Sequence, residues 1–389
     1  MRVLLINVVC GIRSTGRICT DLAEKLTAEG HEVKIAYGRE EVPEQYKKYA
    51  VKIGNKWDQS LHGLRTRILD EHGFGSKKVT KDFLKWADKY NPDMLWLHNI
   101  HGYYINVELL FAWIKKRPDM QVKWTLHDCW AFTGHCSHFM VAQCDQWQEH
   151  CMQCVEKRRY PASVMRDNCK NNYARKKSAF TGVNDMTIIT PSQWLANLVK
   201  RSFLARYPVE VCYNTIDTNV FKPTPSDFRT KYGLQDKKVI LGVASVWNER
   251  KGFKDYIQLA NMLNDNYRIV LIGLNNKQLN DLPANVIGLT RTNNTLELAQ
   301  IYSEAFVFLN LTYEDNFPTV NIEALSCGTP VITYKTGGSS EAIDENTGVC
   351  VNPGNLKDVL NALNLVHEIS RDLCRKRGEC FSKNRSVSN

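Results

Sequence analysis

The chain has 389 residues, of which 43% are hydrophobic and 24% charged, and its formal net charge is +10. One hydrophobic core rarely supports a chain of this length, so we expect two folded domains. The longest apolar runs are far shorter than the roughly 18 residues of a membrane span, and no small-residue cleavage site follows the first apolar stretch. We therefore exclude integral membrane and secreted proteins and expect a cytoplasmic protein that opens with a strand.

The positive charge lies mainly in the first half of the chain. Residues 1–195 hold 29 Lys and Arg against 21 Asp and Glu, whereas the remaining residues hold 22 against 20. Basic clusters at 115–118, 156–159 and 174–177 favour an anionic partner such as the inner face of a membrane or an acidic acceptor. A solvated surface explains any single cluster as well, so peripheral membrane contact stays an open alternative.

Short runs rich in Val, Ile and Leu alternate with segments of helical pattern along almost the whole chain. Continuous apolar runs are typical of parallel strands that helices cover on both faces. Two successive series of such units predict an α/β protein with two doubly wound domains. The first series of predicted strands is 3–9, 33–37, 93–100, 122–128 and 186–192, and the second is 209–214, 238–245, 268–273, 286–289, 305–311, 329–334 and 348–353.

A helical segment, Pro208 and a turn-rich stretch separate the two series and indicate a linker. We place the N-terminal domain at residues 1–205 and the C-terminal domain, with a C-terminal helix, at 206–389. Ligands of doubly wound sheets bind beyond the carboxyl ends of the strands, so motifs that directly follow strands carry the most weight.

The first such motif has Gly11 and Gly16 in a loop between the first strand and a helix that ends at Gly30. Glycines let backbone N–H groups approach a ligand, and the helix N-terminus that follows favours negative charge. A simple tight turn explains this motif equally well.

Histidines mark the ends of two later strands. His98 and His101 follow one strand, and His127 with Asp128 follows the next, so the four side chains should face the same crevice. Histidine donates, accepts or carries a proton near neutral pH, which suits contacts with sugar hydroxyls. A single histidine would more often be structural, but several at adjacent strand ends favour function.

A cysteine-rich insertion follows at about residues 129–160, and the chain has 13 cysteines without a secretory signal. This setting favours thiols or metal over disulfides. Four thiolates complete a zinc tetrahedron, so we predict a structural zinc, with free thiols, disulfides and a redox-active pair as alternatives. The predicted ligands are Cys136, Cys144, Cys151 and Cys154, with His135, His138 and His150 as replacements.

In the second half, Arg250, Lys251 and Gly252 separate a strand from a helix. Two cations beside a glycine at a helix start can neutralise a diphosphate and stabilise its growing charge as it departs. The same three residues can also form an ordinary surface turn, and their position after a strand favours the phosphate interpretation.

Two carboxylates, Asp315 and Glu323, flank the start of another helix. We predict that this helix begins between Pro318 and Val320, with Asn316 or Thr319 near its cap. Asp315 then lies in the loop before the helix and Glu323 lies about one turn inside it. Both carboxylates can accept hydrogen bonds from a diol, whereas Asp315 could equally cap the positive end of the helix.

Together these motifs resemble a known family. "EDNFPTVNIEALSCGTPVI", "TGGSSEAI", "RKG", "YNTIDTNVFKP" and "LHDCWAFTGHC" resemble the retaining GT-B glycosyltransferases of family 4, and in particular their colanic acid or exopolysaccharide branch. The resemblance covers nearly the whole chain, and the pair of acids with its Cys-Gly-Thr-Pro tail is its most specific part. It implies two Rossmann-like domains that face a central cleft.

The resemblance also implies roles for individual residues. Glu323 would hold the ribose of a nucleotide, and Arg250 with Lys251 would hold the diphosphate. His127 would contact the transferred sugar, with His98, His101 and Asp128 on the acceptor side. The donor sugar would contact Asp315 and the backbone at Asn316, Phe317, Pro318 and Thr319, and the loop of Gly11 and Gly16 would close on the donor from the opposite domain.

The sequence departs from the family pattern at three points. Asp315 stands where relatives have Glu, and Val246 stands where many have an Arg that Arg250 would replace. The chain also ends where relatives continue into a last crossing helix, which suggests a truncated tail.

The predicted reaction is transfer of a hexose or deoxyhexose from a nucleotide sugar to a saccharide or lipid-linked saccharide, with retention of configuration. For retention, the resemblance implies front-face attack, in which the leaving phosphate takes the acceptor proton. The chain has no Asp-x-Asp triplet, so we expect no catalytic metal. One alternative is another nucleotide-sugar reaction such as epimerisation. A second is a basic, zinc-containing nucleic-acid-binding protein, which the strand-end motifs disfavour; we expect no nucleic-acid partner.

Overall fold

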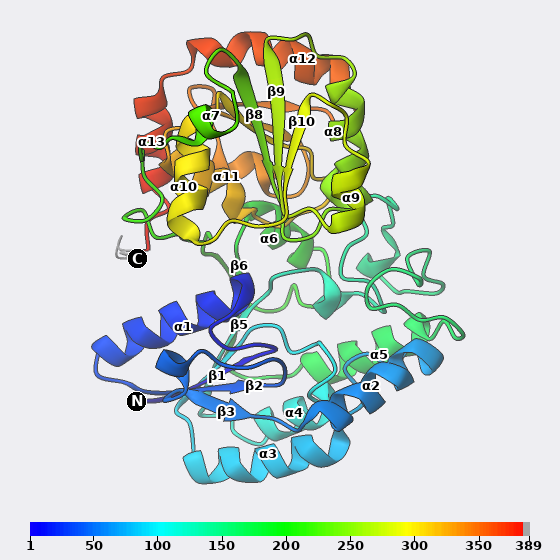
Figure 1. Cartoon of the computed structure of the whole chain (residues 1–389). Coiled ribbons are helices and arrows are strands. Elements are labelled where there is room, and N and C mark those ends of the chain that lie inside the picture. Colours follow the sequence, from blue (N-terminus) through cyan, green and yellow to red (C-terminus); the bar gives the residue numbers. More distant parts are fainter. Residues whose placement is uncertain (384–389) are drawn as a thin grey trace. The chain divides into compact units, whose positions relative to one another are not determined.

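The computed structural model describes residues 1–383, and the chain divides into two compact units, Met1–Cys212 and Tyr213–Asn389 (Figure 1). The boundary between the units falls after Cys212, whereas the sequence predicted a boundary after residue 205. Each unit is an α/β domain built on one parallel sheet.

The N-terminal unit contains a seven-stranded sheet of order β3-β2-β1-β4-β5-β6-β7. Its strands are β1 (Arg2–Asn7), β2 (Glu32–Tyr37), β3 (Ala50–Lys52), β4 (Met94–Leu97), β5 (Gln121–Thr125), β6 (Met186–Thr190) and β7 (Val209–Val211). Its helices are α1 (Arg13–Ala28), α2 (Lys56–Leu69), α3 (Lys77–Tyr90), α4 (Val107–Ile114), α5 (Cys169–Phe180) and α6 (Gln193–Val199).

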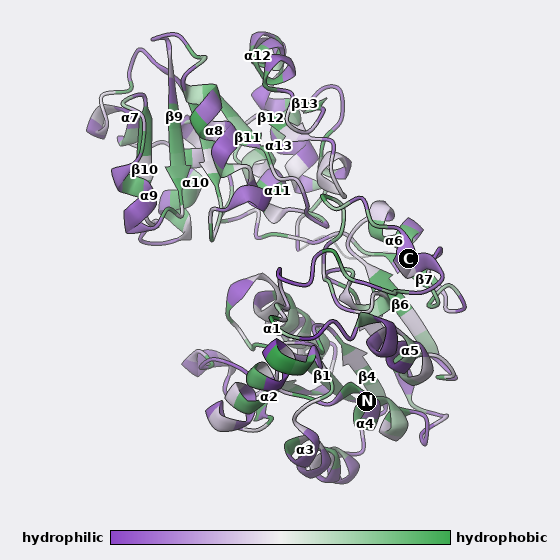
Figure 2. Ribbon diagram, turned by 90° about the vertical axis from the view of Figure 1, so that its right-hand side faces the viewer, coloured by the Kyte–Doolittle hydropathy of each residue, from purple (hydrophilic) through white to green (hydrophobic). Residues whose placement is uncertain are grey.

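Alternate residues of β1 pack into different hydrophobic clusters. Leu4 and Ile6 join the cluster that includes α3, α4 and α6, whereas Val3 and Leu5 pack with α1. Successive side chains of a strand point to opposite faces, so both faces of this sheet are buried. This explains why the predicted strands read as continuous apolar runs, and Figure 2 shows that hydrophobic residues concentrate in the strands of both units.

The sequence misplaced one strand and missed another. The prediction assigned 209–214 to the second domain, but β7 pairs with β6 at the edge of the first sheet, with Val209 opposite Ile188. The short helix α6 returns the chain beside β6, so β7 completes the first βα series. The prediction also omitted β3, because three half-exposed residues at a sheet edge give no apolar run.

The C-terminal unit contains a six-stranded sheet of order β10-β9-β8-β11-β12-β13. Its strands are β8 (Lys238–Val243), β9 (Tyr267–Ile272), β10 (Val286–Leu289), β11 (Val307–Asn310), β12 (Val331–Tyr334) and β13 (Gly348–Val351). Its helices are α7 (Phe228–Lys231), α8 (Phe253–Ala260), α9 (Asn276–Asn280), α10 (Thr295–Glu304), α11 (Thr319–Ser326), α12 (Leu356–Leu365) and α13 (Arg371–Glu379).

Helices cover both faces of this second sheet (Figure 1). Val239 and Leu241 of β8 pack in a cluster with α10, α11 and α13, whereas Ile240 packs in a cluster with α8 and α12. In the described part of the chain, no helix is long and apolar enough to cross a membrane.

Candidate functional site

In each sheet the strand order reverses at one point, and the candidate residues follow the strands there or, for His127 and Asp128, the next strand, β5. In the N-terminal unit the point lies between β1 and β4, and in the C-terminal unit it lies between β8 and β11. The loops that leave two neighbouring strands in opposite directions open a crevice, which is where doubly wound sheets bind ligands.

In the C-terminal unit, Gly252 holds the loop after β8 against the end of β11. Gly252 has φ 72°, and a Cβ at this position would lie 2.2 Å from the Leu311 carbonyl oxygen. The Tyr313 amide also donates to the Arg250 carbonyl at 2.8 Å. Only glycine satisfies both the left-handed backbone and the close approach. The backbone conformation and close packing therefore explain why the predicted cation motif contains a glycine at position 252.

The two cations of this motif contact the loop that carries the predicted acids. The Lys251 ammonium lies 2.6 Å from Oδ2 of Asp315, with the two side chains 19% and 24% exposed. The Arg250 guanidinium donates to the Glu314 carbonyl oxygen at 2.6 Å. The structure thus brings Arg250, Lys251 and Asp315 together, and an anionic ligand there would compete with Asp315 for the lysine.

Helix α11 begins at Thr319, within the predicted range, but its cap differs from the prediction. Pro318 occupies the N-cap position rather than the first turn, and no side chain caps the helix. Thr319 is the first helical residue and Asn316 lies two residues before the cap, where its backbone amide donates to the Asp315 carboxylate at 2.9 Å. The Phe317 ring is buried against Phe381, so this residue can offer only its backbone to a ligand.

The loop after β12 lies directly on the backbone of Asp315. A Cβ on Gly337, which has φ 54°, would lie 1.7 Å from the Asp315 carbonyl oxygen, and the Gly338 amide donates to that oxygen at 3.4 Å. The glycine pair of "TGGSSEAI" therefore fixes the position of Asp315. This role of the two glycines was not predicted from the sequence.

Glu323 lies in the second turn of α11 and is half-buried. Its Oε2 accepts a hydrogen bond from the Tyr302 hydroxyl at 3.1 Å. Burial, and then the neighbouring Glu323 carboxylate, raises the pKa of Tyr302 well above its ordinary value, so the phenol stays protonated and donates. Tyr302 is a positioning residue that the sequence did not reveal.

In the N-terminal unit, Gly11 lies in the predicted loop, whereas Gly16 lies inside the helix that follows. Gly11 has φ 74° in the loop after β1, where a Cβ would collide with the Tyr46 ring. Gly16, in contrast, lies in the first turn of α1, because that helix begins at Arg13 and not after Gly16. The Gly11 amide donates to the Gly16 carbonyl oxygen at 3.1 Å, which ties the loop to the helix.

Asn7 links the two loops of this crevice and was not predicted. It is fully buried at the end of β1. Its amide nitrogen donates to the Val9 carbonyl oxygen at 2.7 Å, and its carbonyl oxygen accepts from the Asn99 amide at 3.2 Å. A buried asparagine in an otherwise apolar strand is the signal that could have identified it.

His98 and His127 contact each other directly. Nδ1 of His98 lies 3.1 Å from Nε2 of His127, and the rings stack with centroids 5.3 Å apart. Burial lowers the pKa of His127 to about 4, although the charge of Asp128 acts to raise it. Burial, and then the charge of His127, lowers the pKa of His98 well below its ordinary value. Both rings are therefore neutral at pH 7 and share one hydrogen-bonding proton.

His101 and Asp128 form a second pair in the same unit. Nε2 of His101 lies 2.9 Å from Oδ2 of Asp128, and the Tyr160 hydroxyl lies 3.3 Å from Nδ1 of His101. Burial alone would raise the pKa of Asp128, but His101 and the Trp130 amide lower it to about 2. Asp128 is thus ionised and oriented. The structure brings all four predicted strand-end residues into two adjacent pairs.

Two further buried histidines surround these pairs and were not predicted. His72 packs against His101 with ring centroids 5.5 Å apart and accepts the Gly102 amide at 3.1 Å. His62 accepts the amides of Gly73 and Gly75, each at 3.2 Å. Both histidines follow no apolar strand, so their place in the sequence gave no signal.

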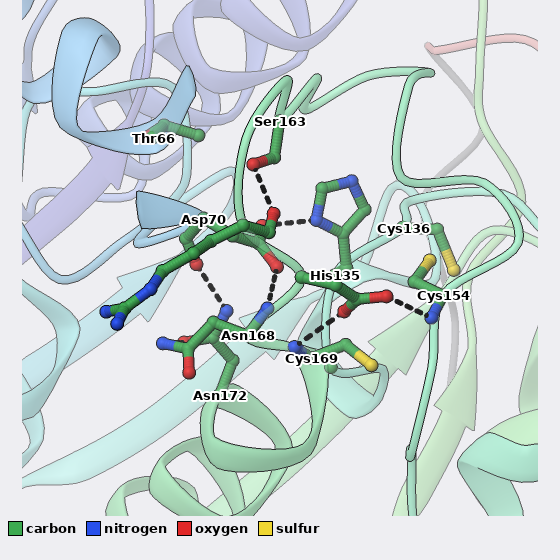
Figure 3. A network of polar contacts seen from close by, with 12 residues as sticks. Thr66, Asp70, His135, Cys136, Cys154, Ser163, Asn168, Cys169 and Asn172 are labelled. Carbon is green, nitrogen blue, oxygen red and sulfur yellow. Dashed lines mark hydrogen bonds and ion pairs between the residues drawn. The ribbon is translucent and has the colours of Figure 1, made fainter. Parts of the chain in front are cut away.

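The cysteine-rich insertion contacts the residue after α2, Asp70, through His135, and the segment before α5 through Cys154 and Asp167 (Figure 3). His135 is ion-paired with buried Asp70, whose Oδ2 also accepts the Asn168 amide at 2.9 Å. The sulfurs of Cys136 and Cys154 lie side by side, and their hydrogen bond lowers the pKa of Cys154 to about 7 despite its burial. Only Nδ1 of His135 contacts Asp70, and its buried Nε2 has no hydrogen-bond partner within the described residues. A carboxylate on one ring nitrogen commonly orients a histidine whose other nitrogen binds metal, so His135 stays a predicted replacement ligand.

The other two predicted zinc ligands lie near this pair. Cys151 accepts the Gly134 amide at 3.2 Å, and its pKa rises to about 11, first through burial and then through Cys144 and Cys154 among other charges. None of the thirteen cysteines, all within the described residues, forms a disulfide. No three His, Cys, Asp or Glu side chains in residues 1–383 are arranged to hold a metal ion, so zinc stays a prediction.

Comparisons with known proteins agree with this division into two units. The family model described as Glycosyltransferase Family 4 matches residues 15–220, and that described as Glycosyl transferases group 1 matches residues 226–380. The "Putative colanic acid biosynthesis glycosyl transferase WcaC" of Escherichia coli is 24% identical over 366 residues, which cover 90% of this chain and 87% of that protein.

Solved structures share the fold across both units. Sucrose-phosphate synthase from Thermosynechococcus elongatus superposes with a TM-score of 0.72 at 17% identity and covers 98% of this chain and 94% of its own. Anabaena HepE in complex with UDP has a TM-score of 0.66 at 16% identity, covering 98% and 96%. These likenesses, with the two parallel sheets, establish the GT-B fold.

Proposed function

The chain belongs to glycosyltransferase family 4, and from that premise we propose that it transfers a sugar from a nucleotide-sugar donor to a saccharide or lipid-linked saccharide acceptor, with retention of anomeric configuration. The contact between Lys251 and Asp315 at the strand-order reversal of the C-terminal unit carries this proposal, because it joins a cation for phosphate to a carboxylate for sugar hydroxyls. The Escherichia coli relative, described as acting in colanic acid biosynthesis, supports a polysaccharide pathway.

The proposed donor site uses the C-terminal unit alone. Lys251 and Arg250 neutralise the diphosphate, and Glu323, oriented by Tyr302, accepts the two ribose hydroxyls. Asp315 turns from the lysine to the hydroxyls of the donor sugar when the diphosphate replaces it. HepE, which shares the fold, has been crystallised with UDP and with UDP-glucose, so a uridine donor is the first to test.

The proposed reaction needs little acid or base from the protein. The bond from the anomeric carbon to the diphosphate oxygen breaks, the acceptor oxygen bonds to the same face of that carbon, and the acceptor proton passes to the departing diphosphate. Charge grows on the leaving oxygen, so fixed cations lower the barrier most. The neutral His98–His127 pair hydrogen-bonds sugar hydroxyls without adding charge at the reacting carbon.

Because side chains neutralise the diphosphate in this proposal, turnover should not require added Mg²⁺ or Mn²⁺. We expect the initial rate to change less than about two-fold when either ion is added or chelated, since metal would repeat the charge already supplied by Lys251 and Arg250. A strict requirement for either ion would contradict the side-chain clamp.

A thermal-shift series tests the donor directly. Donor at 100 times its dissociation constant should stabilise the chain by about 2.7 kcal/mol. UDP and UDP-sugars should raise the melting temperature, whereas UMP, which lacks the second phosphate, should have a much smaller effect. If no nucleoside diphosphate of any base stabilises the protein, the proposed function is wrong.

Product analysis then distinguishes transfer from epimerisation. Incubation with donor alone should leave the nucleotide sugar largely intact, and addition of an acceptor oligosaccharide should release nucleoside diphosphate and a glycoside of the donor's anomeric configuration. Conversion of donor without acceptor into an isomeric sugar would favour the epimerase.

A further inference from the structure

Helix α2 exposes a row of large apolar side chains. Trp57 is 86% exposed, Leu61 63% and Leu64 54%, and Ile68 is exposed at the end of the row. Their spacing of four, three and four residues puts them on one face of the helix. The opposite face is anchored through buried His62 and Thr66. A soluble helix normally presents polar residues outward, so this row requires an explanation.

A second segment extends the row at the end of α2. The Val164 amide donates to the Arg67 carbonyl oxygen at 2.8 Å, and the Arg166 amide donates to that of Ile68 at 3.2 Å. Val164 and Met165, held there by these bonds, are also largely exposed. We call the combined surface the α2 face, made of Trp57, Leu61, Leu64, Ile68, Val164 and Met165.

The surroundings of the α2 face are basic. Residues 56–71 and 156–166 contain seven Lys and Arg against four Asp and Glu. The acids have partners within the chain: Asp70 binds His135, Glu71 binds Arg65, Glu156 binds Arg159 and Asp58 accepts the Asn55 amide. Arg65 and Arg159 are thus used by these acids, whereas the remaining cations include Lys56, Arg67, Arg158 and Arg166, all of which are exposed.

A pocket of about 220 Å³ lies beside the row. Its lining includes Leu61 and Arg65 of α2 and exposed Lys77 and Lys78 at the start of α3. Asp58, which accepts the Asn55 amide, is the one carboxylate among the lining residues, against three cations. Apolar side chains next to a cation-lined pocket match a lipid, whose acyl region is apolar and whose headgroup phosphate is anionic.

We propose that the α2 face docks the protein on an anionic membrane surface, with its apolar side chains between the lipid headgroups and its lysines and arginines against their phosphates. An exposed Trp and Leu row with basic flanks is the pattern of a helix that lies in a membrane interface. Charge also favours this occupant over a second copy of the chain, because a two-fold contact would place the same basic face against itself. The proposal holds whether or not the chain transfers sugars.

Vesicle flotation of the full-length protein tests the proposal. Vesicles of phosphatidylcholine with phosphatidylglycerol should carry the protein upward, and vesicles of phosphatidylcholine alone should carry much less. The double variant Leu61→Ser/Leu64→Ser should partition at least about ten-fold more weakly, because each serine removes a buried apolar side chain from the interface. The matched control Leu296→Ser/Leu365→Ser removes two similarly exposed leucines of the C-terminal unit and should bind as the parent does.

Trp57 provides a second measurement that does not depend on folding stability. Brominated acyl chains should quench its fluorescence in bound protein, and Trp57→Phe should remove that component. The proposal is wrong if the leucine variant and its control bind equally. It is also wrong if vesicles capture nothing while sedimentation velocity shows a dimer that the leucine variant dissociates, since the α2 face would then bind a second copy.

Discussion

The two units share a backbone plan and differ in the chemistry they place on it. Residues 1–212 hold 32 Lys and Arg against 22 Asp and Glu and nine of the ten histidines, whereas residues 213–389 hold 19 basic and 19 acidic residues. Both sheets reverse strand order once, and both place their polar side chains beyond the strands at that point. The fold fixes where a ligand binds, and the loops decide which ligand.

Acidification should reveal the largest difference between the two units, because it should destabilise the N-terminal unit more than the C-terminal unit. Burial lowers the pKa of His62 to about 4 and those of His72 and His98 well below the ordinary value of 6.5. The unfolded chain binds these protons first, so stability falls as the pH drops from about 6.5 to 4, by roughly 3 kcal/mol for His62 alone. Burial lowers the pKa of His135, but the hydrogen bond and charge of Asp70 outweigh it and raise the pKa above its ordinary value, so this one group opposes the loss.

Tryptophan fluorescence can follow this transition, because eight of the nine tryptophans lie in residues 1–212 and only Trp247 lies in the other unit. We expect fluorescence to report unfolding at a higher pH than far-ultraviolet circular dichroism, which also reports the C-terminal unit. Coincident transitions would mean that the units unfold together, and the contrast drawn from their histidines would fail.

Within the C-terminal unit, Lys251→Ala should have the largest effect on catalysis. Removal of a cation that stabilises the leaving group should lower kcat about 10²- to 10³-fold. The pair with Asp315, in which the two side chains are 19% and 24% exposed, is still reached by solvent and should contribute on the order of 1 kcal/mol to stability, so the melting temperature should change only slightly. The matched control is Lys254→Ala, an exposed lysine one turn further on that pairs with Glu249. Comparable losses of activity in both variants would contradict the assignment.

Glu323→Gln should weaken donor binding with a smaller effect on turnover. Charge-assisted hydrogen bonds contribute about 1.5–3 kcal/mol each, so the loss of one should raise the donor dissociation constant roughly 10- to 150-fold. Titration calorimetry with the donor identified by thermal shift measures this constant. The control is Glu379→Gln, whose carboxylate pairs with Arg375 on α13. An unchanged affinity in Glu323→Gln would refute the ribose contact.

The sequence predicted the two parallel sheets and the positions of the strand-end motifs, because buried strands and glycine turns leave local patterns. It could not predict that Lys251 meets Asp315, since the two are separated by more than sixty residues and only the packing of β8 beside β11 joins them. Asn7 and Tyr302 were missed for the same reason: each acts through a partner from another element. Short β7 was misplaced because only pairing with β6 assigns it to a sheet.

The smallest expected effect concerns Cys136, Cys144, Cys151 and Cys154. These thiols lie in or against one hydrophobic cluster with Trp147, and the zinc prediction requires that the insertion bring all four around one ion. Elemental analysis of protein purified without chelator should find about one zinc per chain, because four thiolates complete its tetrahedral shell.

Cys151→Ser/Cys154→Ser should lose the metal, whereas the control Cys350→Ser/Cys380→Ser, with two exposed cysteines of the C-terminal unit, should keep it. The aromatic contacts of Trp147 with Phe132 and Phe139 should preserve most of the fold in the first variant. Metal-free protein with four titratable thiols in this segment would refute the zinc prediction.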